Sequence, residues 1–252
     1  MSGHSKWATI KRKKGATDAA RGRLFTRLIK EITIAARSGG SSEGNPRLRL
    51  AIQTAKASNM PADNIKRAIQ KGTGELPGVA YEEVTYEGYG PGGVAILVEV
   101  VTDNINRAVS EMRHVFSRNN GNLGTSGSVA WMFHKKGIIT IPRTGQKAPL
   151  SEDDLMGIIL DAGADDLQSD DAEFTVTTTP QTFDPVKKAV EEKGITVEHA
   201  ALQMVPQNTV KVTGREAEQL MKLMEAIEEH DDVQNVYANF DIDEKELASL
   251  NG

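Results

Sequence analysis

The sequence contains no cysteine among its 252 residues. The lack of thiols excludes disulfide bonds, thiolate-ligated metal sites and a cysteine nucleophile, and it suits a reducing compartment. Long apolar stretches are missing too. The longest one, VAILVEVV at residues 94–101, is interrupted by Glu99 and is far shorter than the roughly 20 residues that span a bilayer. We therefore expect no membrane partner and a cytoplasmic location.

The first 40 residues are basic, poor in acids and partly amphipathic, which is also the composition of mitochondrial presequences. A mitochondrial location therefore stays open as an alternative. A secretory signal is not expected, because the stretch KWATIKRKKG stays polar where such a signal needs an apolar core.

Positive charge is scarce over most of the chain and concentrated at its start. The formal net charge is −5, but residues 1–75 hold 16 Lys and Arg against 5 Asp and Glu, a net charge of +11, and the remainder carries −16. Such asymmetry between segments indicates that the basic part has a polyanion as its partner. The acidic remainder is expected to limit indiscriminate adsorption to that polyanion.

Residues 20–76 are predicted to form a small basic helical domain. In the first helix, apolar residues recur at steps of three and four, opposite a face that carries arginines and lysines. Proline at the first turn marks two further helices: Pro46 follows the capping residue Asn45, and Pro61 opens the last helix. Gly72 is expected to end that helix.

The rest of the chain alternates strands and helices, which predicts two ferredoxin-like α/β domains, one inserted in the other. A hairpin turns at Gly90–Gly93, a helix follows, and the stretch GSVAWMF at residues 127–133 is expected to be a strand. The acidic inserted domain is predicted at 134–206. The elements that follow are too few to form a domain alone, so the other α/β domain is predicted to comprise 77–133 and 207–242. The fold class is therefore α+β.

No motif recommends an enzyme. The pattern GxGxxG at Gly88, Gly90 and Gly93 is followed by a β-branched strand, whereas a dinucleotide site requires a helix there. The five histidines lack metal-ligand spacing, and the acids of SEDDLMGIILDAGADDLQSDD lack the spacing of a calcium loop. We expect no catalytic residue, no cofactor, no metal and no small-molecule substrate.

Residues 1–20 lack apolar periodicity and are predicted to be a mobile basic arm that becomes ordered on its partner. Its cations, continued by those of the first helix, could neutralise several phosphates together. Trp7 could stack on an unpaired base or instead dock beside Ile10 on the helical domain. The candidate nucleic-acid-binding residues are Lys6, Trp7, Lys11, Arg12, Lys13, Lys14, Arg21, Arg23, Arg27 and Lys30.

The loop RNNGNLGTSGSVAW has three glycines spaced by three, interleaved with amides and hydroxyls. Such a loop can expose backbone N–H groups and small hydroxyls, which suit phosphate or sugar contacts. An ordinary helix-to-strand connection is the alternative, and the spacing alone does not decide. The candidate residues are Asn119, Asn120, Gly121, Asn122, Gly124, Thr125, Ser126 and Gly127.

Four stretches together resemble the YebC family: MSGHSKWATIKRKKGATDAARGRLFTRLIKEI, NPRLRLAIQTAKASNMPADNIKRAI, YEGYGPGGVAILVE and NNGNLGTSGSVAWMF. The resemblance covers the whole chain and extends to the mitochondrial translational activators of that family. It implies a helical N-terminal domain with two α/β domains, one inserted in the other. It also implies a non-enzymatic regulator of gene expression, described either as a DNA-binding transcriptional regulator or as a factor that acts in translation at the ribosome.

Ribosomal RNA is the favoured target of the sequence analysis, because a mobile cationic arm with one aromatic residue suits partly single-stranded RNA. DNA is the alternative target, although the second and third helices lack the tight glycine turn of a helix-turn-helix. A protein–protein adaptor, in which the basic domain is incidental, is a further alternative. A monomer is the default expectation.

Overall fold

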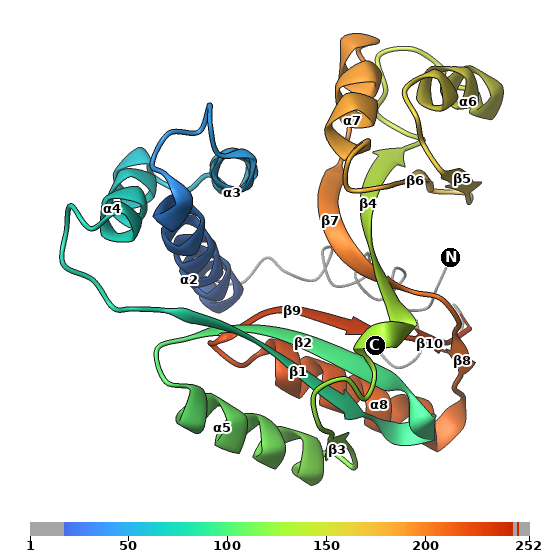
Figure 1. Ribbon diagram of the computed structural model, residues 1–252. Helices are drawn as coiled ribbons and strands as arrows, with labels where there is room; N and C mark the ends of the chain where they lie inside the picture. Colours follow the sequence, from blue (N-terminus) through green and yellow to red (C-terminus); the bar gives the residue numbers. More distant parts are fainter. Residues whose placement is uncertain (1–17, 244–245, 247–252) are drawn as a thin grey trace. The chain divides into compact units, whose positions relative to one another are not determined.

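The computed structural model describes residues 18–243 and 246 (Figure 1). Residues 1–17 of the predicted arm, with its candidates Lys6, Trp7, Lys11, Arg12, Lys13 and Lys14, lie outside these residues, and its last three residues, 18–20, begin the first helix. The chain divides into two compact units. The inserted unit is Trp131–Asn208, and the main unit consists of the segments before and after it.

Three helices begin the main unit, namely α2 (Asp18–Ala35), α3 (Pro46–Ala57) and α4 (Ala62–Thr73). A 3₁₀ turn, Ala36–Ser38, continues α2. The predicted cap of α3 is confirmed: the Asn45 side chain accepts a hydrogen bond from the Leu48 N–H at 3.0 Å, and its amide donates to the Ala35 carbonyl at 2.7 Å. One side chain thus begins α3 and ties it to the end of α2. The three helices share a core of buried apolar residues that includes Leu28, Ile32, Leu48, Ala51, Ala55, Ile65 and Ala68.

The prediction that Gly72 ends α4 is wrong. Gly72 lies within the last turn, where a Cβ atom would come within 2.3 Å of the Thr33 carbonyl oxygen and 2.6 Å of the Ala36 Cβ. Its missing side chain therefore lets α4 approach α2 closely. The helix instead ends at Gly74, whose φ of +83° is the left-handed conformation that favours glycine.

The main sheet has the antiparallel order β3-β1-β2-β9. Its strands are β1 (Glu82–Tyr89), β2 (Ala95–Thr102), β3 (Asn122–Leu123) and β9 (Val233–Ala238). The predicted hairpin is confirmed, with β1 and β2 joined by a 3₁₀ turn, Pro91–Gly93. Gly92 and Gly93 both have a φ of +74°, so the turn explains Gly93, the last glycine of the literal GxGxxG pattern.

Two helices, α5 (Ile105–Arg118) and α8 (Gly214–Glu228), cover one face of this sheet (Figure 1). Between sheet and helices lies an apolar core that includes Ile96, Val98, Met112, Phe116, Leu220 and Leu223, all fully buried. Two short strands, β8 (Val210–Lys211) and β10 (Phe240–Asp241), pair in parallel as a separate sheet.

The inserted unit is a second two-layer sandwich, with helices α6 and α7 on one face of its sheet (Figure 1). In chain order it comprises β4 (Phe133–Pro142), α6 (Glu152–Asp161), β5 (Asp166–Ser169), β6 (Glu173–Thr178), α7 (Phe183–Glu192) and β7 (His199–Pro206). The strand order β5-β6-β4-β7 with β-α-β-β-α-β connectivity is ferredoxin-like. The Ser151 side chain caps α6, accepting from the Asp154 N–H at 3.1 Å.

The predicted α+β class and the order of helical region and sheets are confirmed, with two differences of detail. The main sheet opens with the predicted hairpin, so its connectivity departs from the β-α-β-β-α-β order of a ferredoxin-like domain. The stretch 127–133 is not a strand: Ala130–Met132 form a 3₁₀ turn and β4 begins only at Phe133. Among the described residues, no helix combines the length and apolar character needed to cross a membrane.

Candidate nucleic-acid interface

Three of the predicted binding residues form one stripe along α2. Arg23, Arg27 and Lys30 follow one another at steps of four and three, so they lie on the same side of the helix. All three contact residues 228–232, EEHDD, at the end of α8, here called the acidic segment. This positive stripe therefore faces the acidic segment of the same chain.

Lys30 is the most enclosed residue of the stripe. Its Nζ donates to Asp232 Oδ1 at 2.7 Å, to the Asp231 carbonyl at 2.9 Å and to the Val101 carbonyl at 3.2 Å. The Lys30 and Asp232 side chains are each only 8% exposed. The Lys30 ammonium group is therefore buried and donates to three acceptors of its own chain. Its role in nucleic-acid binding stays a prediction.

The other predicted cations of α2 are more accessible. Arg21 is exposed, and Arg23 and Arg27 are half-buried. Arg23 Nη2 lies 3.8 Å from Glu229 Oε1, and Arg27 donates to the Glu228 carbonyl. Burial and the neighbouring charge of Arg23 lower the pKa of Arg27. These three arginines remain candidates for phosphate contacts.

The glycine-rich loop is held by hydrogen bonds to Glu87, a buried residue of β1. Its carboxylate accepts hydrogen bonds from the N–H groups of Gly127 at 2.6 Å and of Val129 and Ala130 at 2.7 Å. Burial alone would raise the pKa of Glu87, but these three donors lower it. The loop thus already surrounds an anion, and that anion belongs to the chain.

The other loop glycines also have hydrogen-bond partners within the chain. The Gly124 N–H donates to the Glu87 carbonyl at 2.7 Å and the Gly121 N–H to the Phe116 carbonyl at 2.8 Å. Together with Gly127, all three glycines therefore use their N–H groups within the chain. Asn119 is half-buried and donates to the Val115 carbonyl. The remaining loop candidates, which are exposed or half-buried, are Asn120, Asn122, Thr125 and Ser126.

A further set of cations, on α3, on α4 and in the 3₁₀ turn after α2, was not among the predicted binding residues. They are exposed, and none has an acidic partner within 4.0 Å among the residues that the structure describes. The set, called the outer cations below, consists of Arg37, Arg49, Lys56, Lys66, Arg67 and Lys71. Their position opposite the apolar positions of each helix was the signal that could have revealed them.

Arg47 shows the opposite behaviour on the same helix. Its guanidinium donates to Glu31 at 2.7 Å and to Glu83 at 2.5 Å, and these two carboxylates raise its pKa. Arg47 therefore joins α2, α3 and β1, whereas the outer cations leave their charge to solvent.

Asp232 is the centre of a buried polar network within the main unit. Besides Lys30, it accepts hydrogen bonds from Arg107 Nη2 at 2.7 Å and from the Thr102 hydroxyl at 2.8 Å. Burial opposes ionisation, but the hydrogen bonds from Lys30, Arg107 and Thr102 outweigh it and lower the pKa of Asp232 to about 2. The network links α2 to the sheet through charged groups.

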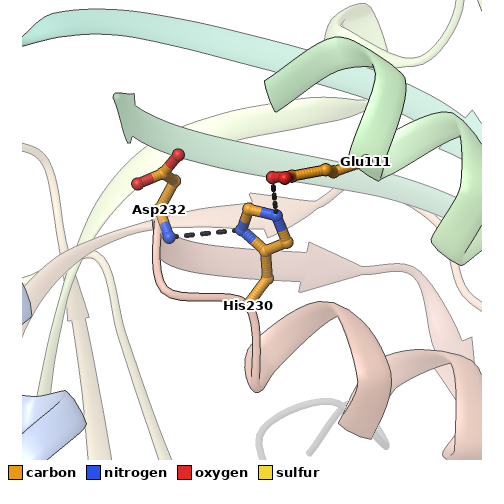
Figure 2. Close-up of side chains that lie close together, drawn as sticks. All are labelled: Glu111, His230 and Asp232. Atoms are coloured by element: carbon orange, nitrogen blue, oxygen red, sulfur yellow. Dashed lines mark hydrogen bonds and ion pairs between the residues drawn. The ribbon is translucent and has the colours of Figure 1, made fainter. Parts of the chain in front are cut away.

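Figure 2 shows His230 between Glu111 and Asp232. His230 Nε2 lies 2.8 Å from Glu111 Oε2, and its Nδ1 accepts from the Asp232 N–H at 3.2 Å. One ligand atom of each residue lies within 4.8 Å of the others, which is compact enough for a metal ion. Because Lys30 and Arg107 already place two positive charges on Asp232, we assign no metal site here.

Two comparisons with known proteins fit a helical region followed by two α/β sandwiches. Residues 5–75 match the TACO1/YebC protein N-terminal domain, and residues 81–240 match the TACO1/YebC second and third domain. The crystal structure of a conserved hypothetical protein, Aq1575 from Aquifex aeolicus, is 47% identical in sequence with a TM-score of 0.81, covering 90% of this chain and 93% of that one.

Two curated relatives match over nearly their whole length. A protein of Koribacter versatilis is 59% identical over 252 residues, 100% of both chains, and one of Solibacter usitatus is 60% identical over 250 residues, 99% of both. Each of those proteins is named "Probable transcriptional regulatory protein". The chain belongs to the TACO1/YebC family.

Proposed function

We propose that this protein is a non-enzymatic regulator of gene expression that binds nucleic acid through its basic N-terminal region. The observation that carries the proposal is the set of outer cations on a helical region of positive net charge, in a chain that is otherwise acidic. Unpaired cations bind the phosphate backbone and release its condensed counterions. The acidic remainder would keep the molecule from coating nucleic acid along its length.

DNA is the target that the relatives favour. They are named as transcriptional regulators, and this supports the DNA-binding alternative over the ribosomal RNA favoured by the sequence analysis. The connection between α3 and α4 also weakens an objection to DNA, since Asn59 takes the left-handed conformation (φ +58°) that a turn glycine would supply. We therefore place DNA first and keep ribosomal RNA as the second candidate.

Crosslinking in living cells, followed by sequencing of the bound nucleic acid, tests both targets. The proposal predicts enrichment of discrete DNA segments that lie upstream of genes. Enrichment of ribosomal RNA with no such DNA would replace the first target by the second. Recovery of neither would contradict nucleic-acid binding and favour the protein–protein adaptor.

A further inference from the structure

Arg23 and Arg27 place two positive charges one helical turn apart with incomplete compensation. The acceptor of the Arg27 guanidinium is a backbone carbonyl, that of Glu228, which carries no net charge. Burial and repulsion from Arg23 lower the pKa of Arg27, and attraction to the Asp231 carboxylate offsets this lowering only in part. An additional anion at this place would offset it further.

The carboxylate that pairs with Arg23 is that of Glu229, and this ion pair is weak. Glu229 Oε1 lies 3.8 Å from Arg23 Nη2, beyond hydrogen-bond distance, and the Glu229 side chain is 60% exposed. An exposed ion pair of this kind is readily exchanged, because solvent screens both partners.

Lys30 marks the inner limit of the exchangeable part. Its ion pair with Asp232 is buried at 2.7 Å and reinforced by two backbone carbonyls. The ion pair of Arg23 is therefore long and exposed, and an external anion can replace its carboxylate, whereas the ion pair of Lys30 is short and buried and is expected to stay intact.

We propose that Arg23 and Arg27 form a binding site for a nucleic-acid phosphate, and that Glu229 occupies it as an internal competitor. Two guanidinium groups one turn apart suit a phosphodiester, whose oxygens accept several hydrogen bonds at once. Binding then exchanges the Glu229 carboxylate for phosphate without disturbing the Lys30–Asp232 pair. This inference rests on the proposed function and names one of its binding sites.

The test measures binding of the full-length chain to a fluorescently labelled 20-base-pair DNA duplex and to an RNA hairpin, by anisotropy at several salt concentrations. Glu229→Gln removes the competitor, and Glu218→Gln, which removes an exposed carboxylate of α8, the helix that ends just before Glu229, is the matched control. Glu229→Gln is expected to raise affinity about two- to fivefold over Glu218→Gln, the range set by the strength of an exposed ion pair.

Arg23→Ala is expected to lower affinity and to make the slope of log K against log salt less steep by about 0.9 on the duplex, because one phosphate fewer is neutralised. Arg215→Ala, an exposed arginine of α8, is the control. A circular dichroism spectrum of each variant serves as the control for folding.

Equal effects of each variant and its control, with the unaltered chain still binding, would overturn this inference and leave the proposed function standing. Failure of the unaltered chain to bind either probe would refute the proposed function, and this inference with it.

Discussion

At the scale of single residues, Asp232 has two ion pairs, with Lys30 and Arg107, although the sequence did not single it out. Its carboxylate accepts from Lys30, Arg107 and Thr102, and the Lys30 side chain is only 8% exposed. Removing the carboxylate therefore leaves a buried positive charge without its counterion.

Asp232→Ala is expected to lower the free energy of unfolding by about 3 kcal/mol, as for other buried pairs in which one partner is removed. Asp231→Ala is the matched control, because Asp231 is exposed and offers Lys30 only its backbone carbonyl. Urea unfolding followed by circular dichroism measures both. Equal small decreases would show that the Lys30–Asp232 pair is not a determinant of stability.

The acid titration of stability also depends on Asp232. Its pKa lies at about 2 in the folded chain, below its ordinary value of 3.8, so ionised Asp232 stabilises the fold above pH 3.8. That contribution disappears as the pH falls from about 4 toward 2, and Glu87 acts in the same direction. The unfolding free energy measured across this range should therefore decline less in Asp232→Asn than in the unaltered chain. Parallel declines in the two proteins would contradict the assignment.

At the scale of helices and strands, glycine has opposite roles in α4 and α6. Gly72 of α4 faces the Thr33 carbonyl and Ala36 with no room for a Cβ, whereas Gly157 of α6 has no atom within 4 Å of that position. A methyl group helps a helix by roughly 0.5–1 kcal/mol where space allows.

Gly157→Ala is therefore expected to raise the unfolding free energy by about 0.5–1 kcal/mol, while Gly72→Ala lowers it by about 1–3 kcal/mol through overpacking of α2 against α4. Thermal unfolding of the two variants makes the comparison. A stabilising Gly72→Ala would mean that α4 does not approach α2 as closely as described.

Most elements could be predicted because each has a local signal. Asn45 with Pro46, Ser151 before an acidic turn, and the glycine turn at Gly90–Gly93 all lie within a few residues of the structure that they determine. The role of Gly72 could not be predicted from such a local signal. Its role depends on Thr33 and Ala36, which lie some forty residues earlier in the chain.

The candidate site was harder to predict for the same reason. Helical spacing places Lys30 on a polar face, but only the folded chain brings Asp232 to that face and buries the pair. Likewise, the loop residues have the composition of an anion site, yet the anion they surround is Glu87, some forty residues earlier. The outer cations were within reach of the sequence, because exposure opposite an apolar stripe is a local property.

At the scale of the whole molecule, residues 1–75 are positively charged and suit binding to a polyanion, whereas the remainder is negatively charged and repels it. Much of the positive charge on α2 is engaged inside the protein by the acidic segment. The outer cations have no such partners among the described residues, so their charge is open to solvent. The proposal that this region binds nucleic acid therefore rests mainly on them.

The salt dependence of binding tests that claim most directly. The triple variant Arg49→Ala/Lys66→Ala/Arg67→Ala removes three outer cations, and Lys187→Ala/Lys188→Ala/Lys193→Ala removes three lysines of the inserted unit as a control. With a DNA duplex, the account predicts that the first variant makes the slope of log K against log salt less steep, by about 0.9 for each phosphate that is no longer neutralised. It predicts no comparable change in the control. An unchanged slope in the first variant, or the same change in both, would contradict it.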